Sequence, residues 1–414
     1  MLLLVMHRRR EGNTPIHLLQ PLSISYLSPS DIMPPSSPSF HSYLEISRAA
    51  LRQNIGTIRK RIGASPRLAF PVKSNGYGHG VEQVVAAVDD LVDRYLVDDS
   101  RELAQLRALT TRPIELLGYV GPDELSVVQE AKGVIPIFDA EHAKAYRAWA
   151  RKRNSTLEAM IAVDLRFGRE GVPVDQALDL IRSLASCQWL SLRGIYGHLS
   201  CADDDPSLSA SREQYQLLKG IADAARCPHL ETHLFASSGI FAFDSLEPFS
   251  QVVRPGLSLY GIWPSERLRH IGEALGYSLL PALSWHSRVV QIKRIPAGFP
   301  IGYGGTFRST SPMTIGLVPQ GYGDGLPRAY AEGSVLVNGE RCSILGRISM
   351  NMITIDLTPL QLTGERLSTE LPAVLLGSQG SETISAEDHA VRTSTIPYEV
   401  TTRISPLLPR VLAD

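Results

Sequence analysis

The residue of this sequence best suited to covalent chemistry is a lysine between an apolar run and a turn. Residues 69–80 read Ala-Phe-Pro-Val-Lys-Ser-Asn-Gly-Tyr-Gly-His-Gly, with the lysine at position 73. At the end of a buried strand an amine loses hydration, which favours its neutral form, and a neutral amine can condense with an aldehyde to a Schiff base. The glycines after Lys73 let the backbone turn tightly and approach a ligand. Taken alone, such a lysine is more often a solvated residue at a strand end. Other segments of the sequence must therefore show whether Lys73 has a catalytic role.

Three further segments carry side chains suited to acid, base or charge-stabilising roles. Arg254 begins Arg-Pro-Gly-Leu-Ser-Leu-Tyr-Gly, His198 is the second residue of Gly-His-Leu-Ser-Cys-Ala-Asp, and Tyr322 is the second residue of Gly-Tyr-Gly-Asp-Gly-Leu-Pro-Arg. Individually, these residues are typical of an ion-pair arginine, a core histidine and a turn tyrosine. Their significance depends on their combination with the lysine segment.

Together these segments resemble the alanine racemase family. Residues 73–80 are similar to the family's pyridoxal-phosphate signature Lys-Ala-Asn-Ala-Tyr-Gly-His-Gly, with Ser74 and Gly76 in place of the two alanines. Residues 254–261 match Arg-Pro-Gly-(Ile/Leu)-x-Leu-Tyr-Gly, and residues 321–328 match Gly-Tyr-Ala-Asp-Gly-x-Pro-Arg except at one position. Similar segments at 301–307, 346–351 and 396–400 extend the resemblance from about Tyr43 to Arg410.

The resemblance implies a racemase, an isomerase that interconverts L-alanine and D-alanine with pyridoxal 5′-phosphate held by Lys73. Racemisation needs two acid/base groups on opposite faces of a planar intermediate. The resemblance implies Lys73 as the base for the D-enantiomer and Tyr322 as the base for the L-enantiomer. It also implies that Arg254 faces the pyridine nitrogen and keeps it unprotonated, which limits side reactions of the carbanion. His198 would support Arg254 and the catalytic tyrosine.

The resemblance further implies how the cofactor phosphate is held. The hydroxyls of Tyr77, Ser238 and Tyr398 would contact it, together with backbone N–H groups near Gly256 and Leu257. The complete implied cofactor-binding set is Lys73, Tyr77, Arg169, His198, Ser238, Arg254, Gly256, Leu257 and Tyr398. No metal is expected.

For the substrate, the resemblance implies Arg169, Tyr303 and Met350. Arg169 would contact the pyridoxal oxygen or the substrate carboxylate, the backbone N–H of Met350 would bind that carboxylate, and Tyr303 would line the path of the substrate. In the family the catalytic tyrosine reaches the cofactor of another subunit, which implies a homodimer with composite active sites.

Several positions depart from the family pattern. Residues 163–171 read Val-Asp-Leu-Arg-Phe-Gly-Arg-Glu-Gly where the family has Val-Asp-Thr-Gly-Met-x-Arg-x-Gly, so Arg169 is kept among bulkier neighbours. Ala162 stands where many members carry a carbamylated lysine that orients this arginine, so another anion such as chloride must orient it, or none does. Asn351 replaces an aspartate and Ser237 an asparagine. Racemisation of serine, or of a broader range of amino acids, is therefore the first alternative.

The elements that must position these residues follow an α/β pattern and then a β pattern. Short apolar segments separated by helical patterns predict βαβ units, with strands at 67–73, 94–98, 114–117, 134–138, 157–163, 190–195, 231–235 and 252–259. These units predict a (β/α)8 TIM-type barrel, with a doubly wound sheet as the competing topology. After residue 280, alternating strands with Gly and Pro turns predict a separate β-rich C-terminal domain with one short helix near 385–390. The predicted domains are a disordered Pro/Ser-rich extension at 1–42, a pyridoxal-phosphate-binding barrel at 43–276 and the β-rich domain at 277–414.

A barrel would bring most of the singled-out residues to one end. Active-site residues of such barrels come from the C-terminal ends of the strands. Lys73 follows the first predicted strand, Arg169 the fifth, His198 the sixth and Ser238 the seventh, and Arg254 lies in the eighth. Tyr322, Tyr303 and Met350 lie in the second domain instead.

Composition restricts the partners. The 41 basic and 42 acidic side chains give a net charge of −1, which favours a small-molecule partner over nucleic acid or an anionic membrane. No stretch approaches the ~20 apolar residues of a membrane span. Four widely spaced cysteines favour free thiols in a reducing compartment. Together with the family's role in supplying D-alanine for bacterial cell walls, this predicts a cytoplasmic enzyme.

Other functions of the same architecture would need different residues or a different domain content. A decarboxylase of basic amino acids would place a carboxylate at the pyridine nitrogen and a glycine-rich loop at the phosphate, and Arg254 and residues 237–239 argue against both. A non-catalytic pyridoxal-phosphate carrier built on the barrel alone would lack the second domain. A degenerate paralogue with little activity stays open because of the departures at Ala162 and Asn351.

Overall fold

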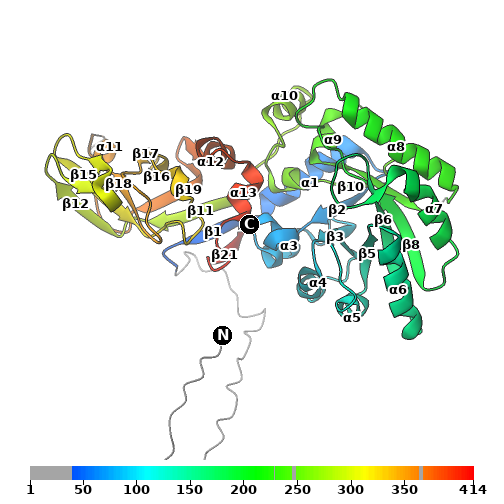
Figure 1. The fold of residues 1–414 in the computed structure, drawn as a ribbon. Helices are drawn as coiled ribbons and strands as arrows, with labels where there is room; N and C mark the ends of the chain where they lie inside the picture. The colour runs from blue at the N-terminus through cyan, green and yellow to red at the C-terminus, as the bar shows by residue number, and fades with distance from the viewer. Residues whose placement is uncertain (1–39, 228, 245–248, 363–366) are drawn as a thin grey trace, which may run out of the picture. The chain divides into compact units, whose positions relative to one another are not determined.

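The computed structural model describes residues 40–227, 229–244, 249–362 and 367–414 (Figure 1). The disordered extension predicted for 1–42 therefore lies outside the described residues, except for positions 40–42. Within the described part, a closed parallel barrel is followed by a β-rich C-terminal domain, which confirms the predicted fold class.

The barrel strands pair in parallel all the way round. Each pairs with its neighbour in the order β2, β3, β4, β5, β6, β8, β9 and β10, and β10 pairs with β2 through Val252 and Val253. This closure excludes the doubly wound sheet, in which the two edge strands stay unpaired. The strands are β2 (Arg67–Pro71), β3 (Arg94–Val97), β4 (Ile114–Leu116), β5 (Gly133–Ile137), β6 (Leu157–Asp164), β8 (Leu190–Tyr196), β9 (Glu231–Ala236) and β10 (Val252–Arg254), and the short β7 (Val172–Pro173) adds to β6.

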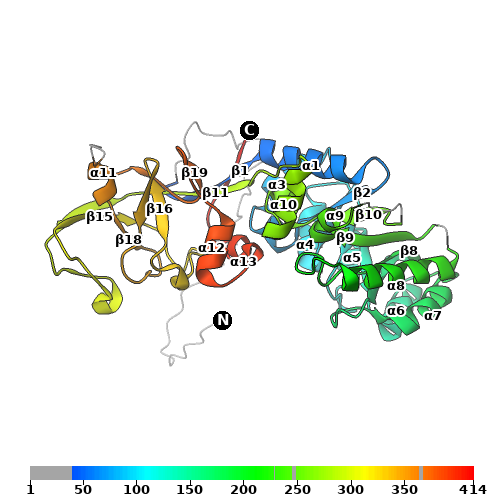
Figure 2. The ribbon, with the colours of Figure 1, turned by 90° about the horizontal axis from the view of Figure 1, so that it is seen from above.

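Helices cover the outside of the barrel strands (Figure 1 and Figure 2). In α7 (Val174–Leu184) the buried residues recur three and four positions apart and so form one apolar face, made by Ala177, Leu180, Ile181 and Leu184. The other barrel helices are α1 (Arg48–Ile62), α3 (Val81–Val88), α4 (Ser100–Arg107), α5 (Leu125–Glu130), α6 (Ala140–Lys152), α8 (Ser209–Ala225), α9 (Ser237–Ala242) and α10 (Glu266–Ala274).

The described residues of the C-terminal domain form three sheets. The largest runs in the order β17-β16-β19-β11-β1-β21, and β20 pairs with β19. Its strands are β1 (Tyr43–Ser47), β11 (Leu283–Arg288), β16 (Ser334–Val337), β17 (Glu340–Ser343), β19 (Pro372–Gln379), β20 (Glu382–Ile384) and β21 (Arg410–Ala413). The smaller sheets are β12 (Gln291–Ile295) with β15 (Met313–Val318) and β18 (Ile353–Asp356), and β13 (Pro300–Ile301) with β14 (Phe307–Arg308).

The first strand joins the second domain rather than the barrel. β1 lies within the boundaries predicted for the barrel, 43–276, yet it pairs antiparallel with β11 and parallel with β21. Its alternation buries Leu44 and Ile46. Alternation predicts which face of a strand is buried but not which strand lies beside it, because pairing joins segments far apart in sequence.

Other element predictions were wrong in part. The alternating pattern after residue 280 does not show where one strand ends, and residues 283–295 form two strands, β11 and β12, in different sheets. The strand expected at 252–259 ends at Arg254 and is followed by a 3₁₀ turn, η2 (Leu257–Tyr260), because Pro255 cannot donate to a strand ladder. Besides α12 (Ala386–Thr393), near the one helix expected there, the domain forms α11 (Thr358–Leu362) and α13 (Pro397–Thr402). A proline at the first helical position is a start signal, so α13 could have been found.

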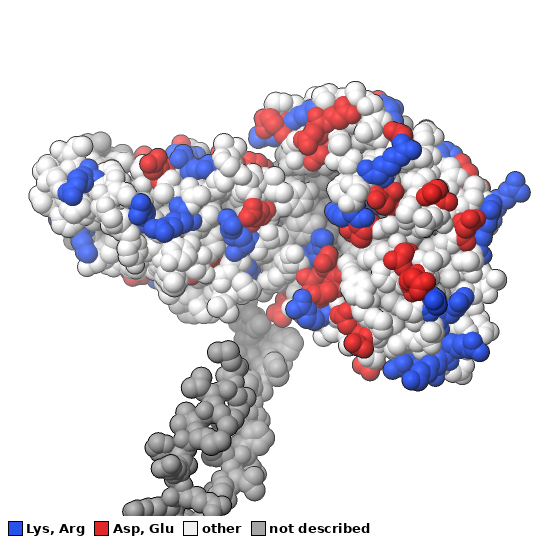
Figure 3. Space-filling view, in the orientation of Figure 1, with Lys and Arg blue, Asp and Glu red and all other residues white. Residues whose placement is uncertain are grey.

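The surface mixes charges of both signs. Figure 3 shows Lys and Arg interspersed with Asp and Glu over the face drawn. No helix in the described ranges is long and apolar enough to span a bilayer. The four cysteines, Cys187, Cys201, Cys227 and Cys342, are free.

Candidate active site

A cavity of about 880 Å³ lies at the C-terminal ends of the barrel strands and is completed by α13. It brings together seven of the predicted site residues: Lys73, Tyr77, Arg169, His198, Arg254, Gly256 and Tyr398. Ser238 and Leu257 do not line it, whereas Ser237 does. Tyr303, Tyr322 and Met350 lie in the second domain, outside the cavity.

A left-handed turn aims Lys73 and Tyr77 at this cavity. After β2, the backbone φ angles of Ser74, Asn75, Gly76 and Tyr77 are 54°, 54°, 61° and 53°. Each non-glycine residue there costs on the order of 1 kcal/mol, so contacts must hold the turn. The Asn75 side chain accepts the N–H of Val81 at 3.0 Å, and the N–H of Gly76 donates to the Val72 carbonyl at 2.7 Å.

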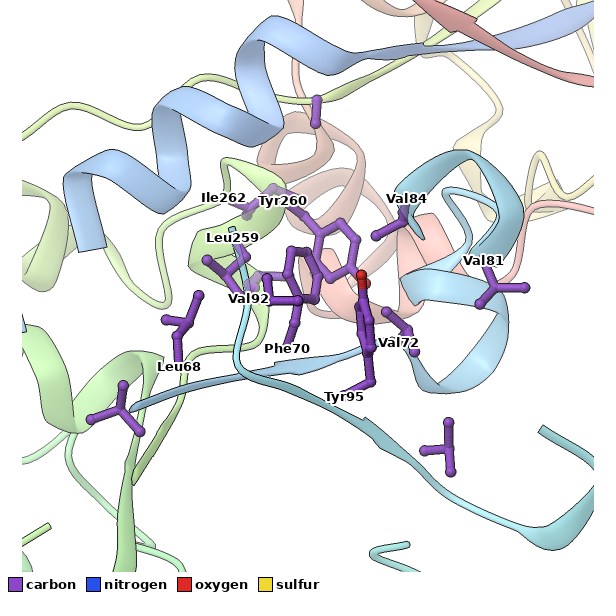
Figure 4. Packing of buried hydrophobic residues seen from close by; sticks show 14 of the residues in the cluster. Leu68, Phe70, Val72, Val81, Val84, Val92, Tyr95, Leu259, Tyr260 and Ile262 are labelled. Atoms are coloured by element: carbon purple, nitrogen blue, oxygen red, sulfur yellow. The ribbon is translucent and has the colours of Figure 1, made fainter. Parts of the chain in front are cut away.

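Aromatic packing supports the turn, and Figure 4 shows two of the rings, Phe70 and Tyr260, beside each other among the buried hydrophobic residues. The ring centroid of Tyr260 lies 5.0 Å from that of Tyr77 and 5.3 Å from that of Phe70. The Tyr260 hydroxyl donates to the Pro71 carbonyl at 2.8 Å, at the end of β2. His79 packs 4.4 Å from the Tyr260 ring, and burial lowers its pKa to about 4, so this histidine is neutral at pH 7.

A close backbone approach brings α13 beside the turn. A Cβ on Gly78 would lie 2.0 Å from the carbonyl oxygen of Thr401, so only glycine permits this contact. The approach places the rings of Tyr398 and Tyr77 5.9 Å apart. Burial raises the pKa of Tyr398 to about 12 and that of Tyr77 as well, so both hydroxyls stay neutral donors. A Cβ on Gly256 would lie 2.8 Å from the Tyr77 hydroxyl. Because glycine has no Cβ, that hydroxyl can lie close to the backbone after β10.

Arg254 is a buried cation at the wall of the cavity. One of its amino groups donates to the Gly197 carbonyl, and its guanidinium carbon lies 5.1 Å from the ring centroid of Tyr196. Burial lowers its pKa. The Arg254 Nε and the Tyr196 hydroxyl are both buried and find no hydrogen-bond partner among the described residues. Because buried polar groups are normally satisfied, these two atoms suit a ligand that offers acceptors.

His198 is neutral and lies among cationic side chains. Burial, and then the positive charges of Arg254 and Arg169, lower its pKa to about 3. Its ring lies 5.7 Å from that of Phe167 in an edge arrangement.

Arg169 has a carboxylate beside it. Its Nε lies 2.9 Å from a carboxylate oxygen of Glu170, and its guanidinium carbon lies 4.6 Å from the ring centroid of Phe167. Ala162 lines the cavity and offers no charge. Glu170, the next residue of the chain, is therefore an anion that contacts Arg169 where Ala162 offers none.

The predicted second-domain residues are exposed on adjoining loops. Tyr303, Tyr322 and Met350 expose 64%, 44% and 56% of their surface. The Tyr322 N–H donates to the Ser349 carbonyl at 3.1 Å, which holds the tyrosine loop against the methionine loop. A Cβ on Gly321 would lie 2.2 Å from that carbonyl, so glycine is needed for the approach.

Of the two adjacent serines, Ser237 lines the cavity and the predicted Ser238 does not. Ser238 is the second residue of α9, whereas the Ser237 hydroxyl accepts the N–H of Ser258 at 3.2 Å and faces the cavity side. A strand-to-helix boundary predicted to within a residue cannot decide which of two adjacent serines points inward.

The cavity residues that were not given a role from the sequence include Asp98, Glu170 and Tyr196. Asp98 follows β3 and Tyr196 ends β8, so the strand-end rule that located Lys73 could have found them. No feature of the sequence marks Glu170 as a site residue, because a glutamate in a polar loop is normally solvated.

Deeper in the barrel lies an ion-pair network. Arg94 bonds to Glu115 and, at 2.7 Å, to Glu231. The ligand atoms of Glu115, Glu231 and His233 lie within 4.8 Å of one another, but Arg94 already supplies a positive charge to both carboxylates. Burial opposes ionisation of Glu231, yet the contacts with His233 and Arg94 lower its pKa to about 2. The arrangement suits a structural network rather than a metal site.

Comparison with known proteins places both halves of the chain in one family. The models "Alanine racemase, N-terminal domain" and "Alanine racemase, C-terminal domain" match residues 46–264 and 282–412. The alanine racemase of Syntrophobacter fumaroxidans is 34% identical over 366 residues, covering 87% of this chain and 94% of that protein. The solved alanine racemase of Clostridium difficile has a TM-score of 0.84 at 25% identity, covering 91% of this chain and 97% of its own. A histidine racemase of Leuconostoc mesenteroides has a TM-score of 0.79 at 23% identity, covering 91% and 99%, a likeness of fold alone. Because the two models span the barrel and the β-rich domain in turn, the chain belongs to the alanine racemase family.

Proposed function

We propose that this chain is a pyridoxal-phosphate-dependent racemase that interconverts L-alanine and D-alanine. The observation that carries the proposal is the cavity lined by a lysine and by a buried arginine that forms no salt bridge with a carboxylate of the described residues. Membership of the alanine racemase family supports it.

The residues present fit pyridoxal phosphate. The orphaned Arg254 Nε suits the pyridine nitrogen, which accepts but does not carry a hydrogen when a permanent cation faces it. The hydroxyls of Tyr77 and Tyr398 and the backbone at Gly256 would hold the phosphate, together with the adjacent Ser237 and Ser238, of which Ser237 lines the cavity. When bound, the cofactor supplies an electron-withdrawing system that makes the α-proton of an amino acid removable.

The chain's own residues would then move the proton. Lys73 Nζ would exchange it on one face of the substrate and the Tyr322 hydroxyl on the other. His198, which is neutral, would orient Arg254 and Tyr322 without adding charge. Because Tyr322 does not line the cavity of its own chain, we infer a homodimer in which each subunit completes the site of the other.

The substrate carboxylate would be bound by a side chain of the barrel and by a backbone group of the second domain. Arg169, held by Glu170, would bind the substrate carboxylate together with the Met350 N–H, and Tyr303 would line the path inward. A racemase of serine or of a broader range of amino acids is the alternative, favoured by Asn351, whose amide donates to Asp324 at 3.2 Å beside the Tyr322 loop.

The test is a chiral assay. Purified protein with pyridoxal phosphate is given L-alanine, L-serine or L-lysine in separate reactions, and D-isomers are measured by chromatography beside a Lys73→Ala control. D-alanine formed fastest and lost in the control is the expected result. Faster formation of another D-isomer would favour the broader racemase, and no D-isomer from any substrate would contradict the proposal.

An internal check is available because the two enantiomers are equally stable in water. The ratio of kcat/KM for the two directions must therefore be unity for the enzyme and for every variant. Unequal values would reveal a contaminating activity.

A further inference from the structure

An arginine near the end of the chain contacts the turn that carries Lys73 and Tyr77. Arg410 is the first residue of β21, and its guanidinium donates to backbone carbonyl oxygens on two sides. On one side, its Nε and Nη2 donate to the carbonyl of Gly78, which closes the turn, at 3.1 Å and 3.0 Å. None of the roles that the family resemblance implies is assigned to this arginine.

On its other side Arg410 binds the segment between α13 and β21, residues 403–409. Its Nη1 donates to the carbonyls of Ser405 and Leu408 at 2.8 Å and 2.7 Å, and its Nη2 donates to that of Ile404 at 3.4 Å. One cation therefore binds four carbonyl groups from two segments that are far apart in sequence. A guanidinium suits this arrangement because its N–H groups point outward in a fixed plane.

Neighbouring residues hold Arg410 in this position. The side chain of Gln83, on α3, donates to the Arg410 carbonyl at 3.2 Å, and a Cβ on Gly80 would lie 3.3 Å from Cδ of the arginine. Strand β21 lies next to α3, as can be followed in Figure 1. Burial lowers the pKa of Arg410, but a guanidinium still carries its charge at pH 7. The arginine is therefore a fixed cation between the turn and the segment at 403–409.

The segment at 403–409 also contacts the loop that carries Tyr322. The Ser405 N–H donates to the Asp324 carbonyl at 3.0 Å. A Cβ on Gly325 would lie 2.6 Å from the Cα of Ile404, so glycine is needed for this approach. Through Arg410 and the segment that it binds, the chain thus links its lysine turn to its tyrosine loop.

We propose that Arg410 is a positioning residue that fixes the lysine turn relative to the tyrosine loop of the same chain. The inference rests on the proposed function for its consequence, because in the proposed dimer the lysine and the tyrosine of one chain serve different active sites. Arg410 would then set the position of the cofactor-binding turn in one site and of the proton-transfer tyrosine in the other. The hydrogen bonds themselves do not depend on that function.

Hydrogen–deuterium exchange of the purified full chain, read by peptide mass spectrometry, measures these contacts. Arg410→Gln removes the cation and keeps a polar side chain. The amides of Gly78, His79 and Gly80 close the turn, and that of Ser405 reaches the tyrosine loop. We expect these amides to exchange about tenfold faster or more, because hydrogen bonds from a charged donor add to the local stability of both segments. Amides of the barrel strands β5 and β6 should exchange as in the unchanged protein.

Arg107→Gln is a matched control. The Nε of Arg107 donates to the Ala131 carbonyl at 2.8 Å, and its Nη1 donates to those of Thr110 and Arg112 at 2.8 Å and 3.0 Å. These carbonyls precede β5 and β4, at the opposite end of the barrel from the cavity. The control therefore also removes a guanidinium that binds backbone carbonyls, but it should leave exchange in the turn and at Ser405 unchanged.

A second measurement separates positioning of the turn from general stability. Equilibrium dialysis of each protein against pyridoxal phosphate gives the dissociation constant of the cofactor. We expect it to rise about tenfold in Arg410→Gln, as when the binding-competent arrangement of the turn becomes tenfold rarer. The rise should be smaller in Arg410→Lys, which keeps the charge but has one nitrogen for both segments. Arg107→Gln should bind the cofactor as the unchanged protein does.

Three results would overturn the proposal. The first is exchange in Arg410→Gln within about threefold of the unchanged protein in the turn and at Ser405. The second is equally faster exchange in β5 and β6, which would show that Arg410 only stabilises the domain. The third is faster exchange in one of the two segments alone, which would show that Arg410 does not link them. If Arg410→Gln does not fold, Arg410→Lys is compared in the same way, with a smaller change expected in the same amides. Exchange needs neither substrate nor turnover, so failure of the racemase assay leaves this result unaffected.

Discussion

Mixing two inactive variants tests whether the two proton-transfer groups come from different subunits. Lys73→Ala removes the amine from the cavity, and Tyr322→Phe removes the hydroxyl of a tyrosine that is 44% exposed and does not line that cavity. Each change alone should lower kcat by about 10²-fold or more, because each removes one acid/base group.

The activity expected after mixing follows from the fraction of active sites that carry neither change. Random re-association of equal amounts makes about half of the dimers mixed, and each mixed dimer has one site with both changes and one with neither. The mixture should therefore recover about one quarter of the activity of the unchanged protein.

The assay dissociates both variants in mild denaturant, mixes them, restores buffer with pyridoxal phosphate and measures D-alanine from L-alanine. Variants treated separately and then combined without dissociation serve as the control, and light scattering reports the oligomeric state. Activity no higher than that of the control, in a sample that has re-associated, would refute the composite site, since a tyrosine acting on its own chain cannot be complemented.

Three further outcomes are expected. Gly261→Ala should lower the free energy of unfolding in urea by more than about 3 kcal/mol, because φ is +86° and the Cβ would lie 1.7 Å from a carbonyl oxygen. Gly276→Ala, with φ of +78° and open space, should cost only about 1 kcal/mol, and equal losses would contradict this account. Burial lowers the pKa of His389 to about 4, so only the unfolded chain gains its proton as pH falls below about 6.5, and this histidine should add up to ~1.4 kcal/mol per pH unit to the decline in stability toward pH 4, beside the contributions of His79 and His198. His389→Gln should lessen the slope by about that amount, and an unchanged slope would show that His389 does not contribute to it. Glu170→Gln should raise KM for alanine about two- to fivefold, as for a half-exposed ion pair, whereas Glu213→Gln should not, and equal changes would show that Glu170 does not act through Arg169.

Most of the barrel and of its site could be predicted because the relevant signals are local. The apolar run before Lys73 and the polar residues after it mark a strand end, and parallel strands of a barrel bring such ends together. The same rule applies to His198 and Arg254. The choice between Ser237 and Ser238 could not be made, since it depends on the rotation of the first turn of α9.

The contacts between distant segments were not predictable in the same way. Lys73 and Asp98 stand 25 positions apart, and the strand-end rule places both at the same end of the barrel without showing that they are in contact. Their contact depends on the register of β2 against β3 and on the room left by Gly118. Register is set by pairing and packing over the whole sheet, not by the residues that use it.

By itself, the sequence determined the class of architecture, the family and the residues that could carry the chemistry, because periodicity and short motifs act over a few residues. The tertiary structure alone decided that β1 pairs with β21 in the second domain, that Asp98 supplies a counter-charge to Lys73, and that Tyr322 lies away from the cavity of its own chain. These features follow from closure of the barrel and pairing of the sheets, which join segments that no local pattern connects.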